Sequence, residues 1–157
     1  MTSLRAAAEE FLAQRRIAVA GVSRDEKQPA NLIYRRLRAA GYEVYAINPN
    51  AETAEGDVCF GAVQDVPVEL DGIVIVTTPE VAEHVVTEAH QAGVPRVWLH
   101  RGLGTGSSSA NAVAFCKEHG MTVIPGGCPN MFGATADTGH RCMRVVLQLS
   151  GKVPRKI

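Results

Sequence analysis

The sequence lacks the features that mark several large classes of protein. Its 157 residues contain no apolar window approaching the roughly 18 residues of a membrane span. Acidic residues stand near the N-terminus where a signal peptide would have its apolar core. Sixteen Lys and Arg residues balance sixteen Asp and Glu residues, so no overall charge attracts nucleic acid or an anionic membrane. We expect a cytoplasmic protein that binds neither nucleic acid nor a membrane. Any anion must therefore be bound by a local site.

Patterned cysteines are also missing. Cys59, Cys116, Cys128 and Cys142 form no CxxC pair, and no His is placed to complete a zinc quartet. Widely spaced cysteines of this kind are usually reduced and buried. The sequence therefore predicts free thiols and no metal site.

Two nucleotide-binding motifs are absent as well. The string GxxxxGK followed by Ser or Thr does not occur, which argues against an NTPase. The segment GVSR follows the first predicted strand with only one of the three glycines of GxGxxG. The second predicted strand ends in Asn48-Pro49, where an NAD site would have an acidic residue for the ribose. Both departures disfavour a nicotinamide cofactor.

What the chain does contain is a regular alternation of apolar runs and helical spacings, within a length typical of one domain. Residues 1–157 are therefore expected to form a single α/β domain. Strands are predicted over 16–21, 42–50, 71–78, 94–102 and 121–127, and helices over 3–14, 31–40, 79–92, 107–120 and within 135–150. This order predicts a Rossmann-like, doubly wound, five-stranded parallel sheet with helices on both faces. We expect the apolar side of each helix to pack against the sheet.

In such a sheet, ligands bind beyond the carboxyl ends of the strands. After the first predicted strand, Ser23 offers a hydroxyl, and Arg24 and Lys27 offer positive charge. The backbone N–H groups leading into the next helix add the positive end of its dipole. This loop predicts a site for a pyrophosphate or phosphomonoester. The alternative is that the two cations are solvated charges balanced by Asp25 and Glu26.

Polar residues follow the next two predicted strands too. Asn48 and Pro49 either form a turn, which both residue types favour, or contact a ligand. Thr77 and Thr78 precede a helix that opens on Pro79, so they are candidates for helix capping and for ligand contact, and the two roles are compatible.

The last two strand ends carry less specific signals. Arg101 is a candidate anion contact, whereas His100 has no Ser or Cys spaced to form a nucleophile pair. The segment GLGTG, residues 102–106, is expected to form a turn into Ser107–Ser109, which can cap the following helix. Cys128 either lines the same cleft or packs in the core.

In this order, GVSR, INPN, VTTP, WLHRGLG and GGCPNMF resemble the CoA-binding protein family. Its members are small stand-alone proteins similar to the CoA-binding domain of the succinyl-CoA synthetase alpha subunit. The resemblance covers residues 15–132 and implies that the 3′-phospho-ADP part of CoA lies across the strand ends. The residues that it implies for CoA are Gly21, Val22, Ser23, Arg24 and Lys27 on the first loop, Asn48 and Pro49 near the adenosine, Val76, Thr77, Thr78 and Pro79 as another wall, and Leu99, His100, Arg101 and Gly102 near the pantetheine arm.

The resemblance implies a protein that binds CoA or an acyl-CoA without catalysis, as a sensor or carrier. The synthetases carry their phosphorylated histidine and nucleotide-grasping machinery in further domains, so we expect no catalytic residue and no enzyme activity. Two alternatives stay open. One is a small NAD(P)-dependent or CoA-transforming enzyme using His100 or Cys128, and the other is a module that docks on an unknown protein under the control of CoA. Cys128 near a bound pantetheine would also be placed for a mixed disulfide with CoA.

Overall fold

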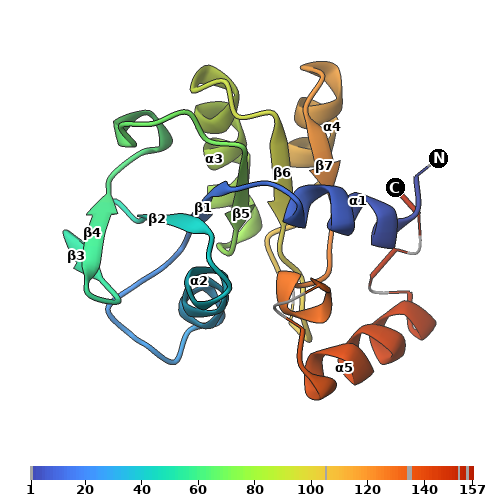
Figure 1. Ribbon diagram of the computed structural model, residues 1–157. Coiled ribbons are helices and arrows are strands. Elements are labelled where there is room, and N and C mark those ends of the chain that lie inside the picture. Colours follow the sequence, from blue (N-terminus) through green and yellow to red (C-terminus); the bar gives the residue numbers. More distant parts are fainter. Residues whose placement is uncertain (1, 105, 134–135, 152, 155) are drawn as a thin grey trace.

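The computed structural model describes residues 2–104, 106–133, 136–151, 153–154 and 156–157, and Figure 1 shows a central sheet with helices around it. Within these residues one sheet has seven strands in the order β3-β4-β2-β1-β5-β6-β7. All neighbouring strands are parallel except β3 and β4, which are antiparallel. The strands are β1 (Arg16–Ala20), β2 (Glu43–Ile47), β3 (Thr53–Ala54), β4 (Asp57–Phe60), β5 (Gly72–Ile75), β6 (Arg96–Leu99) and β7 (Thr122–Ile124).

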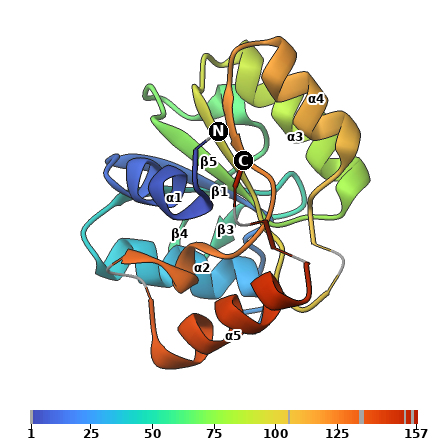
Figure 2. The same cartoon turned by 90° about the vertical axis from the view of Figure 1, so that its right-hand side faces the viewer.

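Helices cover both faces of the sheet (Figure 2). The α-helices are α1 (Leu4–Leu12), α2 (Pro29–Ala39), α3 (Pro79–Gln91), α4 (Ala110–Glu118) and α5 (Thr138–Leu149), with short 3₁₀ helices η1 (Val63–Asp65) and η2 (Pro129–Met131). One buried cluster joins α1 and α2 to the sheet, and a second joins α3 and α4 to its other face. No helix in the described ranges has both the length and the apolar character needed to cross a membrane.

The burial of the central strands explains why the chain forms this sheet. In β5 all residues are buried, and β1 is buried from Ile17 onward. A strand that is covered on both faces needs such a continuous apolar run, which is the pattern that predicted these strands. The predicted Rossmann-like, doubly wound α/β fold is confirmed.

The predicted number of five strands is wrong, because the segment between β2 and β5 contributes β3 and β4. β4 pairs with β2 in parallel, and β3 turns back on β4 as a two-residue hairpin. Glu55 and Gly56 form its turn with φ of 55° and 80°, and two successive residues with positive φ are the conformation that a tight hairpin needs. Strands this short carry too few residues for an alternating pattern, so periodicity did not reveal them.

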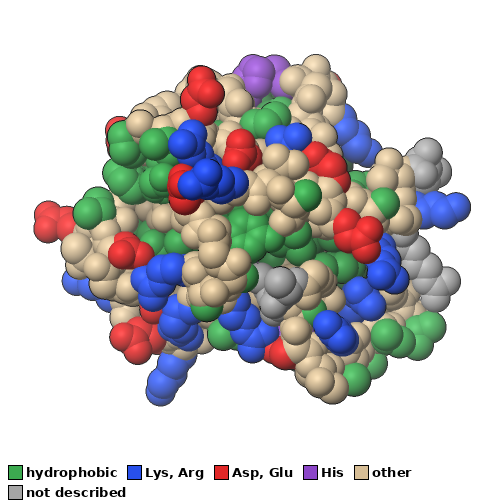
Figure 3. All heavy atoms as spheres, viewed as in Figure 1, with side chains coloured by type: hydrophobic (Ala, Val, Ile, Leu, Met, Phe, Trp, Pro, Cys, Tyr) green, Lys and Arg blue, Asp and Glu red, His purple; other side chains and the backbone are tan. Residues whose placement is uncertain are grey.

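The expectation that the sheet covers every apolar helix face is wrong for α5. Leu147 is its buried residue, whereas Val145, Val146 and Leu149 are exposed, Leu149 to 71%. The helix lies below the sheet and packs on η2, and hydrophobic side chains are visible on the outer surface over it (Figures 1 and 3). Helical spacing predicted the helix but not its place, because α5 lies beyond the carboxyl ends of the strands.

Candidate functional site

A cleft of about 800 Å³ opens at the carboxyl ends of the parallel strands. It lies where the strand order changes direction, since β2 follows β1 on one side and β5 lies against β1 on the other. Its volume is in the range of roughly 300–1,000 Å³ that is usual for small-molecule sites. Among the predicted site residues, those that line it are Lys27, Val76, Thr77, Thr78, Pro79, His100 and Gly102.

Gly21, at the end of β1, allows this strand end to approach the end of β5 closely. Its φ is +102°, and a Cβ at this position would lie 2.1 Å from the carbonyl oxygen of Val76, which follows β5. Only glycine tolerates both the conformation and this approach of two backbones. The side chains of Val22 and Leu99 are buried in the core, so any ligand contact from these two residues would come from the backbone.

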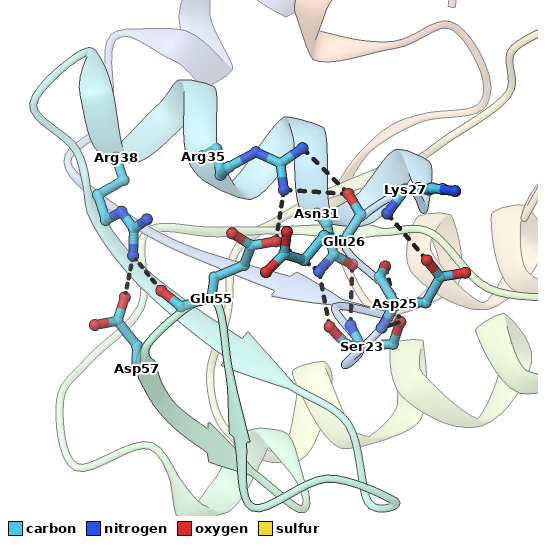
Figure 4. A network of polar contacts seen from close by, with 9 residues as sticks. All are labelled: Ser23, Asp25, Glu26, Lys27, Asn31, Arg35, Arg38, Glu55 and Asp57. Atoms are coloured by element: carbon cyan, nitrogen blue, oxygen red, sulfur yellow. Dashed lines mark hydrogen bonds and ion pairs between the residues drawn. The ribbon is translucent and has the colours of Figure 1, made fainter.

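The loop after β1 is held by its own hydrogen bonds. The Ser23 N–H donates to Asn31 Oδ1 at 3.0 Å, and the Asn31 Nδ2 donates back to the Ser23 carbonyl at 2.7 Å. The Ser23 hydroxyl accepts from the Asp25 N–H at 3.1 Å. Both groups that Ser23 would offer to a phosphate therefore already take part in the structure of the loop (Figure 4).

A partly buried polar network extends from this loop to the β3–β4 hairpin. Asn31 Nδ2 also donates to Glu55 Oε1 at 2.8 Å, and Arg35 forms an ion pair with the same oxygen at 2.6 Å. Arg38 donates to the Glu55 carbonyl at 2.9 Å (Figure 4). The hairpin that the sequence did not reveal thus supports the loop after β1 through α2.

The two cations of this loop remain available. Arg24 and Lys27 are exposed, and within the described ranges neither side chain forms a hydrogen bond or an ion pair. Asp25, proposed above as a balancing partner, instead accepts from the Gln28 side chain at 2.8 Å and from the Lys27 backbone N–H at 3.1 Å. These two bonds hold the pKa of Asp25 below its usual value. Lys27 lines the cleft, and Figure 4 shows its ammonium extending away from the network.

The next two strand ends have the structural roles that were the alternatives to ligand contact. Asn48 donates from Nδ2 to the Val22 carbonyl at 3.0 Å and accepts from the Asn50 N–H at 2.9 Å, which forms a turn. Thr78 caps α3 through the Val81 N–H. Contact of Thr77 and Thr78 with a ligand is compatible with these bonds, because both line the cleft. Pro49 is exposed and outside it.

Ser107 joins the loops that follow β5 and β6. Its hydroxyl accepts from the Thr77 N–H at 2.7 Å and donates to the Thr77 carbonyl at 2.8 Å. The helix cap that we assigned to Ser107–Ser109 is Ser109, which accepts from the Ala112 N–H. The predicted GLGTG turn includes Thr105, which lies outside the described residues.

The segments after β6 and β7 form the wall of the cleft that carries His100, Cys128 and Asn130, which we call the far wall. His100 and Cys128 are buried there and carry no charge at neutral pH. Burial, together with nearby His140, lowers the pKa of His100 from 6.5 to about 4, so its imidazole is neutral at neutral pH. Burial raises the pKa of the Cys128 thiol to about 12. Cys128 both lines the cleft and is buried, so the two alternatives for it hold together. The Arg101 backbone N–H donates to the Gly127 carbonyl at 2.9 Å and ties this wall to the segment after β7.

Helix α5 closes the cleft from the side opposite the sheet, through His140 and Met143. Asp137 caps this helix, accepting from the His140 N–H at 2.7 Å, and it also forms an ion pair with Arg36 of α2. These contacts hold the pKa of Asp137 well below its usual range. The predicted helix began as early as residue 135, which lies outside the described residues. Sequence reasoning missed Leu32, Asn130, His140 and Met143 as cleft residues, because no local pattern places them there.

Comparison with known families identifies the family of this chain. Residues 15–149 match the family described as CoA binding domain. The chain belongs to the CoA-binding domain family. The resemblance noted in the sequence, over residues 15–132, is therefore confirmed, and the matched region also includes α5.

Similar proteins include stand-alone chains and parts of ligases. The uncharacterized protein YneT of Bacillus subtilis is 26% identical over 73% of this chain and 82% of its own length. The alpha subunit of acetate–CoA ligase (ADP-forming) II of Pyrococcus furiosus is 27% identical over 81% of this chain, which spans 29% of that subunit. The solved structure of a hypothetical protein from Pyrococcus horikoshii OT3 has a TM-score of 0.72 and 25% identity, over 78% of this chain and 84% of that one.

Proposed function

We propose that this domain binds CoA or an acyl-CoA in the cleft at the carboxyl ends of β1, β5 and β6, without catalysis, as a sensor or carrier. The observation that carries the proposal is the cleft itself. It lies at the point where open α/β sheets bind nucleotides, and the loop after β1 carries Arg24 and Lys27, whose side chains have no partner among the described residues. Membership in the CoA-binding domain family supports the choice of ligand.

The charge of the first loop suits the nucleotide end of CoA. Arg24 and Lys27 lie on the segment that leads into α2, and Lys27 lines the cleft. Charge-assisted hydrogen bonds to phosphate are stronger than those between neutral groups. Because Ser23 is engaged within the loop, we assign the phosphate contacts to these two cations, with Ser23 positioning the loop.

The rest of the cleft suits the pantetheine arm and an acyl group. Leu32, Val76 and Met143 contribute apolar surface to its walls. Ligand sites commonly combine such apolar walls with a few polar groups that fix orientation. The cleft therefore provides one charged end and one largely apolar end, as a CoA thioester requires.

The pKa values of Cys128 and His100 on the far wall support binding without catalysis. An activated cysteine has a lowered pKa, whereas burial raises the pKa of Cys128 to about 12. His100 has a pKa of about 4 and would be a weak base at neutral pH. Neither group has the activation that acyl transfer would need in the unliganded protein.

Calorimetric titration with CoA, dephospho-CoA and NAD in parallel tests the proposal. We expect saturable binding of CoA, weaker binding of dephospho-CoA because it lacks the 3′-phosphate, and still weaker binding of NAD. Equal binding of NAD, or no binding of any of the three, would contradict the proposal. Turnover of a thioester by the purified protein would contradict the absence of catalysis.

The cations provide a second test. Replacing them in Arg24→Ala and Lys27→Ala should weaken CoA binding several-fold each, through the loss of a charge-assisted bond, and should leave the melting temperature unchanged. Lys117→Ala is the matched control, because Lys117 is an exposed lysine on α4, away from the cleft. Affinity that is unchanged in either cleft variant would remove that residue from the site.

A further inference from the structure

Asn130 is a buried polar side chain whose hydrogen-bonding groups are unused. It is 1% exposed and lines the cleft, yet neither its Oδ1 nor its Nδ2 has a hydrogen-bond partner among the residues that the structure describes. Asn31 is equally buried, and both ends of its amide are bonded. Buried amides without a partner are rare in folded proteins, because the lost hydration is not replaced. The exception at Asn130 lies where a ligand is expected.

The backbone that carries Asn130 is fixed by hydrogen bonds and packing. Asn130 belongs to η2, which the Met131 N–H closes by donating to the Cys128 carbonyl at 2.9 Å. The η2 segment packs against α5 and α2, and the Arg144 side chain donates to the Met131 carbonyl at 3.3 Å. The segment that carries the free amide of Asn130 is therefore packed and hydrogen-bonded.

The chemistry of the neighbours limits what Asn130 can bind. The other polar cleft groups on this wall include His100 and the thiol of Cys128, and Met143 adds apolar surface. His100 and Cys128 are uncharged at neutral pH, whereas Lys27 lines the cleft from the loop after β1, so we place the phosphates at that loop. A free carbonyl oxygen beside a free amide nitrogen is complementary to an N–H and a C=O that face the same side of a ligand. The N–H and C=O of one trans amide point in opposite directions, so the two groups must come from successive amides. CoA has two successive amides, both in its pantetheine arm.

We propose that the Asn130 side chain pairs with the two successive amides of the pantetheine arm, Oδ1 accepting from the N–H of one amide and Nδ2 donating to the carbonyl of the other. This inference rests on the proposed function, because it assumes that CoA occupies the cleft. It orients the ligand with its phosphates at Lys27 and its arm along η2. Asn130 thereby distinguishes CoA from nucleotides that lack the arm.

The test compares CoA with adenosine 3′,5′-bisphosphate, which lacks the arm, on the wild type and on Asn130→Leu. Leucine resembles asparagine in shape and removes both unpaired groups, so the melting temperature of the free protein should stay the same or rise. CoA affinity should fall about tenfold or more, because the two ligand amides lose their hydrogen bonds to Asn130. Affinity for the bisphosphate should not change. Asn111→Leu, an exposed position on α4, is the control for the substitution itself.

The outcomes separate the two proposals. If the wild type binds CoA and Asn130→Leu binds it equally well, or loses CoA and the bisphosphate to the same extent, the role of Asn130 is wrong and CoA binding stands. If the wild type binds no CoA, both proposals are wrong. A lower melting temperature with unchanged CoA preference would show a structural role only.

A measurement on the wild type remains decisive should the variant fail to fold. In a two-dimensional ¹⁵N–¹H spectrum, the side-chain NH₂ resonances of Asn130 should shift on addition of CoA and stay in place with the bisphosphate. The NH₂ resonances of Asn111, an exposed residue on α4 away from the cleft, should respond to neither ligand. An Asn130 signal that does not respond to saturating CoA would overturn the inference.

Discussion

The two walls of the cleft are built in opposite ways. On the loop after β1, the protein uses its own polar groups, since Asn31 bonds both the N–H and the carbonyl of Ser23. On the far wall, Asn130 is as deeply buried as Asn31, but within the described part of the chain its side chain has no hydrogen-bond partner, and His100 and Cys128 are uncharged. The first wall is complete without a ligand, and the second is not.

This difference separates two tasks in ligand recognition. Under the proposed function, a loop that is fixed by internal bonds holds Arg24 and Lys27 ready for a phosphate, so that little ordering is needed when the ligand arrives. A buried amide without a partner contributes only when the correct group reaches it, and it penalises ligands that lack that group. The first arrangement favours affinity, and the second favours selectivity.

The largest effect should come from breaking the close contact between the ends of β1 and β5, which underlies the first wall. Gly21→Ala would place a Cβ 2.1 Å from the Val76 carbonyl oxygen at a φ of +102°. We expect destabilisation of more than about 3 kcal/mol, because both strand ends must move apart. Urea denaturation measures the loss of unfolding free energy.

Gly41→Ala is the matched control for this change. Gly41 has a similar φ of +95°, but no atom lies within 4 Å of a Cβ built there. It should cost only about 1 kcal/mol, the price of the backbone conformation alone. Equal losses in the two variants would mean that the approach of the two strand ends carries no energy.

The comparison between the walls is tested most directly by the same substitution in both. Asn31→Leu leaves the Ser23 N–H unpaired and removes one partner of Glu55, so we expect a loss of about 3 kcal/mol in unfolding free energy. Asn130→Leu removes no bond, so its unfolding free energy should be unchanged or higher. Similar destabilisation by both variants, in parallel urea titrations, would contradict the distinction drawn here.

A smaller effect should appear in the pH dependence of stability. The folded protein keeps His100 neutral down to a pKa of about 4, whereas the unfolded chain protonates it near 6.5. Below pH 6.5 the unfolded state therefore binds more protons, and stability falls as the pH is lowered toward 4. Between pH 7 and pH 4.5, the wild type should lose roughly 2 kcal/mol more than His100→Gln. Parallel pH profiles for the two proteins would show that burial of His100 has no such effect.

The sequence was sufficient where one residue pattern determines one outcome. The continuous apolar runs of β1 and β5 predicted central parallel strands, and the polar residues after them predicted the edge at which the cleft lies. Asn48 and Thr78 were recognised as turn and cap candidates, because those roles depend on neighbours in the chain.

The rest depends on contacts between distant segments. Asn130 is 99 residues beyond Asn31, and nothing in the sequence distinguishes the amide that is bonded from the one that is free. The apolar spacing of α5 is compatible with a sheet-facing helix, yet Met143 faces the cleft and Leu149 faces solvent. Such assignments follow only once the packing of η2 against α5 is known.

The short strands at the two margins of the sheet have a consequence for behaviour at high concentration. At one margin β3 has two residues, and at the other β7 has three. A long, open edge strand would expose a row of unpaired N–H and C=O groups on which another chain could assemble. With such brief edges, this largely parallel sheet offers little template for fibril growth, so the domain should resist aggregation through strand addition.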